Sequence, residues 1–203
     1  MTIKKGSPYG EPGVPLPDDG VVVRSDAEAR RVLEECRRDG RPFPVLGLLA
    51  GDLCRTLAGP GDERRLRSER AVTFTVDVGQ VLVDGRLHLF VAHAIARNRW
   101  WTRAVAAMNA QWVGEWNLGP RGHPNDGLLD TYDAHLQLAD LWKVRARLPS
   151  GTHLPHPRIK ERRAAAVQIE LEKPLPLHLD GEVVGEARVL SLRAEPDALR
   201  VVV

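Results

Sequence analysis

Two carboxylates lie on either side of one glycine near the end of the chain, in the sequence Asp180-Gly181-Glu182. A general base must be held rigidly, and two acids flanking a tight turn between strands would be held in this way. The same residues also have a structural interpretation, because Asp-Gly is a favoured pair for a type I′ hairpin turn. Spacing alone favours the turn and leaves proton transfer by Asp180 and Glu182 as the alternative.

Two histidines and one aspartate have spacings that occur in metal sites. His153 and His156 are three residues apart, but no cysteine or second close pair accompanies them, and Pro155 between them is incompatible with an ordinary helix face. We therefore favour a loop at the domain surface over a zinc site. Asp126 carries the oxygen ligands that magnesium prefers, yet its Asn-Asp-Gly context favours a turn.

Four of the five tryptophans fall within one short region of the chain: Trp100, Trp101, Trp112 and Trp116. With His153, the first three are our candidates for lining a pocket that binds a lipid or another small molecule. Tryptophan is also enriched in protein interfaces, so a core or interface role is the alternative.

The composition is that of a globular protein, with 203 residues, 43% of them hydrophobic and 28% charged. The net charge of +2 gives no reason to expect nucleic acid as a partner. Arginines gather within residues 30–38, 64–70 and 158–163, and we interpret these clusters as solvated faces, with an anionic head group as the minority alternative. The two cysteines form no C-x-x-C motif, and no apolar run reaches the ~20 residues of a membrane span, so we expect a cytoplasmic protein without a transmembrane segment.

The first part of the chain predicts a short arm followed by one βαβ unit. Residues 1–20 contain too many glycines and prolines for a regular element. A strand is expected at 21–23, a helix beginning with the capping box of Ser25 and Glu28, and a parallel strand at 44–49. Two parallel strands do not form a stable sheet alone. The unit must extend another sheet, pack on the rest of the chain, or pair across a homo-oligomer.

The remainder predicts a large antiparallel β domain. After a charged connector at 62–70, apolar residues alternate with polar ones, and Asp84-Gly85 and Asp180-Gly181 are strong hairpin signals. Further strands are expected at 72–78, 87–91, 104–118, 127–132, 167–172, 175–179, 189–193 and 199–203, with one short helix at 136–144. The predicted fold class is therefore α+β, with an arm at 1–20, a small α/β part at 21–61 and a β domain at 62–203.

Three stretches, in order, resemble the family of diacylglycerol kinases, sphingosine kinases and bacterial lipid kinases. Residues 125–130, N-D-G-L-L-D, are similar to the family's D-D-G-x-L-D. Residues 151–157 contain G-T-H and H-P, like its G-x-H…H-P segment, and Asp180-Gly181-Glu182 is followed by Pro196-Asp197-Ala198-Leu199 as in the family's closing strands. The resemblance covers about residues 45–203.

This resemblance implies two domains with a phosphoryl-transfer cleft between them. The first domain would bind ATP through glycine-rich loops, and the second, a β-sandwich-like domain, would supply the lipid site. Glu182 would be the general base, Asp180 would lie near the nucleotide, and Asp126 would help hold a structural magnesium ion. Asp52, Arg55 and Thr56 match the end of the family's G-T-G-N-D-x-A-R-T-L segment and are the candidate nucleotide-binding residues.

The sequence departs from the family at both phosphate loops. Residues 48–51, L-L-A-G, replace the glycine, threonine and asparagine before Asp52, and residues 24–28, R-S-D-A-E, stand where G-G-D-G-T would open a helix. Glycines there would let backbone N–H groups approach the phosphates, whereas acidic side chains would repel them. The upstream strands of the family's first domain do not fit into residues 1–20, so we expect a truncated nucleotide domain.

The interpretation that we favour is a non-catalytic, pseudokinase-type relative of lipid kinases that binds a ligand or partner and needs no cofactor. The first alternative is an active kinase that uses ATP and magnesium to phosphorylate a lipid or another alcohol, with Arg55 or the arginines at 64–70 meeting anionic groups. The second is a structural homo-oligomer, which the incomplete βαβ unit and its exposed strand edges would favour.

Overall fold

The computed structural model describes residues 9–203. Part of the predicted N-terminal arm, residues 1–8, therefore lies outside the described residues. The rest of the arm contains one short strand, β1 (Glu11–Pro12), which pairs antiparallel with the start of β4 (Val72–Val83). No helix in the described part of the chain is both long and apolar enough to cross a membrane.

The predicted βαβ unit is present. It consists of β2 (Val21–Val23), α1 (Asp26–Arg38) and β3 (Leu46–Leu48), and the two strands are parallel. Ser25 caps α1 by accepting a hydrogen bond from the backbone N–H of Glu28, as predicted. The Glu28 carboxylate accepts from the N–H of Arg24 at 2.7 Å, one residue earlier than in a standard capping box.

The βαβ unit extends the main sheet, which is the first of the three arrangements that the sequence left open. Strand β3 pairs in parallel with the last residues of β13 (Glu182–Val202), through Val201 beside Leu46 and Val202 beside Gly47. Strand β13 therefore joins the α/β part to the antiparallel strands within a single 11-stranded sheet. Buried side chains of both parts form a common core around β3, β4 and the end of β13.

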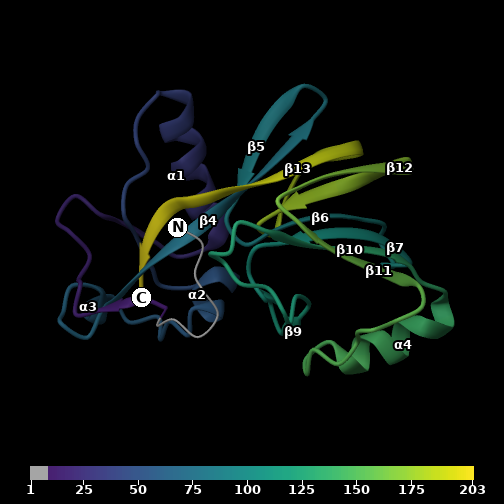
Figure 1. Ribbon diagram of the computed structural model, residues 1–203, viewed down its shortest axis with the longest axis horizontal. Coiled ribbons are helices and arrows are strands. Elements are labelled where there is room, and N and C mark those ends of the chain that lie inside the picture. Colours follow the sequence, from purple (N-terminus) through teal and green to yellow (C-terminus); the bar gives the residue numbers. More distant parts are fainter. Residues whose placement is uncertain (1–8) are drawn as a thin grey trace.

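The rest of the chain is mostly antiparallel sheet, so the predicted α+β class is confirmed. Along the sheet the strand order is β1-β4-β13-β12-β6-β7-β10-β11, and β5 pairs with β4 (Figure 1). The bounds of the strands not yet given are Arg86–Phe90 for β5, His93–Arg97 for β6, Arg103–Met108 for β7, Leu129–His135 for β10, Ile159–Ala164 for β11 and Ala166–Leu179 for β12.

Both predicted Asp-Gly hairpins are confirmed. Asp84 and Gly85 have φ angles of 49° and 77° between β4 and β5, and Asp180 and Gly181 have angles of 50° and 87° between β12 and β13. Two successive residues at positive φ are what a type I′ turn requires. The two turns have the same backbone shape, yet Asp84 is exposed and Asp180 is buried.

The expected single strand at 104–118 is wrong. Strand β7 ends at Met108, and a separate two-stranded hairpin follows, formed by β8 (Trp112–Val113) and β9 (Trp116–Asn117). After β7 the backbone N–H groups of Asn109 and Ala110 both donate to the carbonyl oxygen of Ala92, which ends the regular pairing, and Gly114, with a φ of 56°, forms the turn between β8 and β9. The connector contains α3 (Glu63–Leu66), a short α2 (Asp52–Thr56) follows β3, and α4 (Leu138–Arg147) is the predicted helix.

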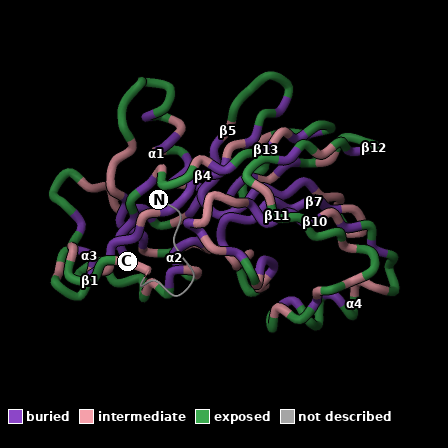
Figure 2. The backbone as a smooth tube through the Cα atoms, in the orientation of Figure 1, coloured by how far each residue is buried: buried purple, intermediate pink, exposed green. Residues whose placement is uncertain are grey.

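Figure 2 shows buried backbone through the middle of the sheet and exposed backbone at its hairpin tips and along α4. Helix α4 lies at the opposite end of the molecule from α1 (Figure 1). These two helices mark the two regions that carry candidate functional residues.

Candidate functional site

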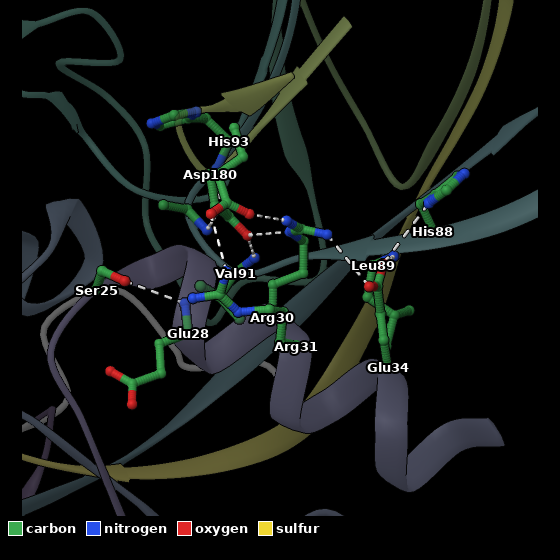
Figure 3. Close-up of polar contacts among 12 residues, drawn as sticks. Ser25, Glu28, Arg30, Arg31, Glu34, His88, Leu89, Val91, His93 and Asp180 are labelled. Atoms are coloured by element: carbon green, nitrogen blue, oxygen red, sulfur yellow. Dashed lines mark hydrogen bonds and ion pairs between the residues drawn. The ribbon is translucent and has the colours of Figure 1, made fainter. Parts of the chain in front are cut away.

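The first region is a buried polar cluster where α1, α2, the start of β6 and the β12–β13 turn meet. Its members are Asp26, Arg30, Asp52, His93, Asp180 and Glu182. Figure 3 shows the side chains of Asp180 and Arg30 directed toward one another, with His93 and Val91 beside them. The sequence predicted three of these residues as functional, namely Asp52, Asp180 and Glu182.

Asp180 is held as a buried hydrogen-bond acceptor. Its side chain is fully buried, and its carboxylate accepts from the backbone N–H groups of Val91, Ala92 and His93 at 3.0, 2.8 and 3.1 Å. Val91 and Ala92 lie between β5 and β6, and His93 is the first residue of β6, so Asp180 ties the β12–β13 turn to the start of β6. Burial raises the pKa of Asp180, against the lowering effect of the charge on His93 and of the three N–H donors.

Glu182 is engaged by two arginines of α1. Its carboxylate oxygens lie 2.6 Å from Arg30 Nη2 and 2.9 Å from Arg31 Nη1. Arg30 is buried, and it also pairs with Glu34 at 3.2 Å. The interpretation of this arginine cluster as a solvated face is therefore wrong for Arg30, because the side chain closes the gap between α1 and the β12–β13 turn.

Asp26 occupies the backbone N–H groups that begin α2. Its carboxylate accepts from the N–H of Asp52 at 2.5 Å and from the N–H of Leu53 at 3.2 Å. A Cβ atom at Gly51 would come within 2.5 Å of Asp26 Oδ1, so a residue without a side chain is needed for this approach. Free backbone N–H groups at the start of a helix can bind an anion, and here the Asp26 carboxylate occupies them.

Asp52 joins the cluster through its side chain. Its Oδ2 lies 3.0 Å from Nε2 of the buried His93, and its Oδ1 accepts from the N–H of Gly114 at 2.8 Å. The imidazole Nε2 therefore carries the hydrogen that Asp52 accepts. Nδ1 of His93 is buried and has no hydrogen-bond partner among the described residues.

Arg55 and Thr56 connect α2 to the β8–β9 hairpin. The guanidinium of Arg55 stacks 3.8 Å from the ring centre of Trp112 and donates to the carbonyl oxygen of Gly114 at 2.6 Å. The Thr56 hydroxyl accepts from the N–H of Gln111 at 3.0 Å. All three candidate nucleotide-binding residues thus make contacts that fasten α2 to this hairpin.

The close approach of several acids shifts their protonation. Burial, reinforced by the charges on Asp180 and Asp52, raises the pKa of Asp26 to about 7, and the N–H groups that it accepts from oppose this only in part. Burial lowers the pKa of His93, but the hydrogen bond with Asp52 and the charges on Asp180 and Asp26 outweigh it and place the pKa above its ordinary value. Every one of these shifts favours the protonated form near neutral pH.

Asp126 contacts an arginine. Its carboxylate pairs with Arg163 and also accepts from the N–H of Leu128 at 3.0 Å. Within residues 9–203, no group of three His, Cys, Asp or Glu side chains is arranged to hold a metal ion. His156 forms a backbone bridge with Ile159, and its Nδ1 accepts from the N–H of Arg158 at 3.2 Å.

Asp77 holds two of the motif segments together. This buried carboxylate accepts from the N–H of Gly127 at 2.6 Å and from the N–H of Asp197 at 2.9 Å. Asn125 donates from its side chain to the Asp197 carboxylate at 2.8 Å. The stretches at 125–130 and 196–199 are therefore adjacent in space, at the register shift where β13 passes β4.

The second region is an apolar cavity of about 60 Å³ beneath α4. Trp101 and His153 line it, whereas Trp112 stacks on Arg55 and Trp100 is exposed, so the four candidate pocket residues are not together. The other lining side chains that matter here are Trp116, which packs edge-on against Trp101 with the ring centres 5.4 Å apart, and Tyr132.

Two polar groups of this cavity lack partners. The Tyr132 hydroxyl and His153 Nδ1 are buried and form no hydrogen bond with any described residue. Burial raises the pKa of Tyr132, and burial lowers the pKa of His153, so both side chains are neutral at pH 7. The cavity therefore offers apolar walls and two neutral hydrogen-bonding groups.

Sequence reasoning missed the residues that complete both regions. Asp26 and Arg30 were hidden because their partners lie 26 and 152 positions away along the chain. Tyr132 was read only as part of a strand, although its side chain is on the cavity side of β10. Its alternation with Ala134, which also lines the cavity, was the signal that could have identified it.

Comparisons with known proteins agree with the resemblance to lipid kinases. Residues 66–203 match the family described as YegS C-terminal NAD kinase beta sandwich-like domain. A putative diacylglycerol kinase from Bacillus anthracis str. Sterne is similar in structure, with a TM-score of 0.68 and 14% identity over 90% of this chain and 76% of that one. A diacylglycerol kinase from the same organism gives a TM-score of 0.60 and 15% identity over 90% and 75%. No curated protein matches the chain.

Proposed function

Since the chain belongs to the family of YegS C-terminal NAD kinase beta sandwich-like domains, we propose that it is a diacylglycerol-kinase-like protein that binds a ligand without transferring phosphate. The observation that carries this proposal is the Asp26 carboxylate on the amides of Asp52 and Leu53. A phosphate that approached these amides would meet a carboxylate already bound to them. Its entry would require displacing the Asp26 carboxyl group and breaking both hydrogen bonds.

The state of the two candidate catalytic carboxylates supports the same proposal. Asp180 uses both oxygens as acceptors for backbone N–H groups, and Glu182 is neutralised by Arg30 and Arg31. A general base needs a free lone pair within reach of the hydroxyl proton. These residues do not fit the roles of nucleotide contact and base, so we derive no step of phosphoryl transfer from them.

The nucleotide test is a thermal unfolding experiment with ATP and magnesium. A ligand present at 100 times its Kd should stabilise the protein by about 2.7 kcal/mol. We expect no measurable change in Tm at millimolar ATP, and no transfer of labelled phosphate to diacylglycerol or to a total lipid extract. A saturable rise in Tm together with labelled lipid product would contradict the proposal and support the kinase alternative.

The cavity beneath α4 is the proposed ligand site. Its walls are apolar, and the partnerless Tyr132 hydroxyl and His153 Nδ1 would find partners in a ligand that carries one hydroxyl or carbonyl group. A volume of about 60 Å³ is smaller than the usual pocket of ~300 Å³ or more, so we expect α4 to move outward on binding. Only Val144 is buried within this helix, so moving α4 outward costs little free energy.

The two described tyrosines allow a matched test of this site. Tyr132→Phe should weaken the binding of a long-chain primary alcohol or a monoacylglycerol by roughly threefold to tenfold, because a ligand hydrogen bond contributes ~0.5–1.5 kcal/mol. The ligand-free variant should be as stable as the parent or slightly more stable, since a buried hydroxyl without a partner is removed. Calorimetric titration and urea unfolding measure the two effects.

Tyr9→Phe is the control for this prediction. The Tyr9 hydroxyl donates to the carbonyl oxygen of Thr75 at 3.1 Å, outside the cavity. Its removal should lower stability by ~1 kcal/mol and leave ligand affinity unchanged. Two results together would show that the cavity is not the site. Tyr132→Phe would lower the stability of the ligand-free protein as Tyr9→Phe does, and no ligand of this class would bind the parent or either variant.

A further inference from the structure

Three large apolar side chains are exposed at the α4 end of the molecule. Leu138 and Trp142 are 67% and 81% exposed and lie four residues apart, on one face of α4, while Trp100, 63% exposed, lies in the β6–β7 turn. That turn is fastened to the segment before α4, because the carbonyl oxygen of Thr102 accepts from the N–H of Leu136 at 2.7 Å. We call these three side chains, with the cations around them, the α4 face.

The cations of the α4 face outnumber its acids. The turn at 97–103 and the segment at 137–148 together contain six arginines and lysines and one carboxylate, Asp140. Asp140 pairs with Arg158 at 3.2 Å, and Arg103 pairs with Asp133 at 2.6 Å. Among residues 9–203 the other five cations have no carboxylate partner, and they are Arg97, Arg99, Lys143, Arg145 and Arg147.

This combination distinguishes the α4 face from the other exposed apolar residues. Exposed tryptophans with arginine or lysine around them are typical of an amphipathic helix that lies in a membrane interface, with the rings at head-group level and the cations near anionic lipid. Arg99 stacks 5.6 Å from the ring centre of Trp100, so a cation accompanies a ring directly. The opposite side of α4 lines the apolar cavity through Leu141, Val144 and Arg145, and Arg145 lies over the ring of Trp116.

We propose that the α4 face docks on a lipid bilayer that contains anionic lipids, with Trp100, Leu138 and Trp142 entering the interface and Arg99, Lys143 and Arg147 meeting the head groups. The bilayer is the partner that the charge pattern fits best, because cations from two separate elements surround the apolar side chains on a surface without a free carboxylate. Docking in this orientation turns the α4 end of the molecule toward the lipid. It does not depend on the proposed ligand site.

The test is co-flotation of the full chain with vesicles. We expect binding to vesicles of phosphatidylcholine mixed with phosphatidylglycerol, at least tenfold weaker binding to phosphatidylcholine alone, and strong weakening in high salt. Trp142→Ala should reduce the partition coefficient by about tenfold, and Arg147→Gln by about fivefold. These side chains are exposed, so urea unfolding should show unchanged stability for each variant.

Matched controls come from the other exposed side chains. Leu138→Ala should lower the vesicle partition coefficient, whereas Leu87→Ala, in β5, should leave it unchanged. In the same way, Arg188→Gln should have no effect on the partition coefficient, in contrast to Arg147→Gln. Absence of binding to anionic vesicles overturns the proposal. This is the result expected if the partner of the α4 face is an acidic protein. Equal binding to neutral vesicles also overturns the proposal, as does a loss in Leu87→Ala equal to that in Leu138→Ala. Because none of these substitutions lies among the cavity side chains, ligand titration separates a failure of docking from a failure of the ligand site.

Discussion

Asp180→Ala is expected to lower the free energy of unfolding by about 3–5 kcal/mol, as measured by urea denaturation. The substitution removes the acceptor of three N–H groups, at Val91, Ala92 and His93, and leaves them buried without partners. It also leaves the Arg30 guanidinium, whose Nε lies 4.0 Å from Asp180, without one of its nearby carboxylates. The first loss falls on the junction between the β12–β13 turn and the start of β6, and the second on the contact between that turn and α1.

Asp84→Ala provides an unusually close control. Asp84 also precedes a glycine in a type I′ turn, with a φ of 49° against 50° for Asp180, so the backbone strain of placing alanine at positive φ is the same in both variants. Asp84 is exposed, and its side chain makes no hydrogen bond with any described residue. Its replacement should cost no more than ~1 kcal/mol. Similar losses in the two variants would show that the N–H contacts of Asp180 contribute little.

The outcome bears on what the Asp-Gly-Glu motif does. A residue kept for proton transfer or nucleotide contact is expected to affect activity more than stability, because functional sites carry strained or partly unsatisfied groups. Asp180 is instead satisfied on both oxygens, and Glu182 is paired. A large stability loss, with no phosphoryl transfer in the parent, would fit a motif that now joins α1 to the sheet.

The fold was predictable where local signals decide the structure. The two Asp-Gly turns require positive φ angles that few residue pairs tolerate, and the Ser25 cap is formed by residues within one helical turn. The parallel order of β2 and β3 follows from the length of the connecting helix. Strands β7, β8 and β9 were merged into one because nothing in the apolar pattern separates them, whereas the irregular pairing of Asn109 and Ala110 with Ala92 and the turn at Gly114 divide them.

The candidate sites were less predictable because their partners are distant in the sequence. Nothing near Asp26 indicates that its carboxylate reaches the start of α2, and nothing near Glu182 indicates two arginines of α1. The resemblance identified Asp52 as a candidate, and residue types and spacing identified Asp180 and His153, but what each side chain contacts followed only from the fold. The tryptophans were grouped by sequence proximity, and the fold separates them among the cavity, the α2 contact and the α4 face.

The acid cluster predicts that the protein is more stable on the acidic side of neutrality. The pKa of Asp26 is about 7 in the folded protein and about 3.9 in an unfolded chain, so between these values the folded state binds the extra proton. Stability therefore falls as pH rises, by roughly 3 kcal/mol between pH 5 and pH 8. His93 and Asp180, whose pKa values are also raised, change stability in the same direction. Urea unfolding at a series of pH values measures the slope.

Asp26→Asn tests whether Asp26 causes this slope. The asparagine has one oxygen in place of two, so it can accept from the N–H of Asp52 or of Leu53 but not from both, and it neither repels Asp180 and Asp52 nor titrates. The variant should be less stable than the parent at pH 5, because one N–H group loses its acceptor, and it should lose most of the pH dependence. Asp39→Asn, at the exposed end of the same helix, should keep the parent's slope, because the hydrogen bond from Arg41 lowers the pKa of Asp39. An unchanged slope in Asp26→Asn would mean that the carboxylate at the start of α2 is charged throughout this range, and that a phosphate would meet a permanent negative charge there.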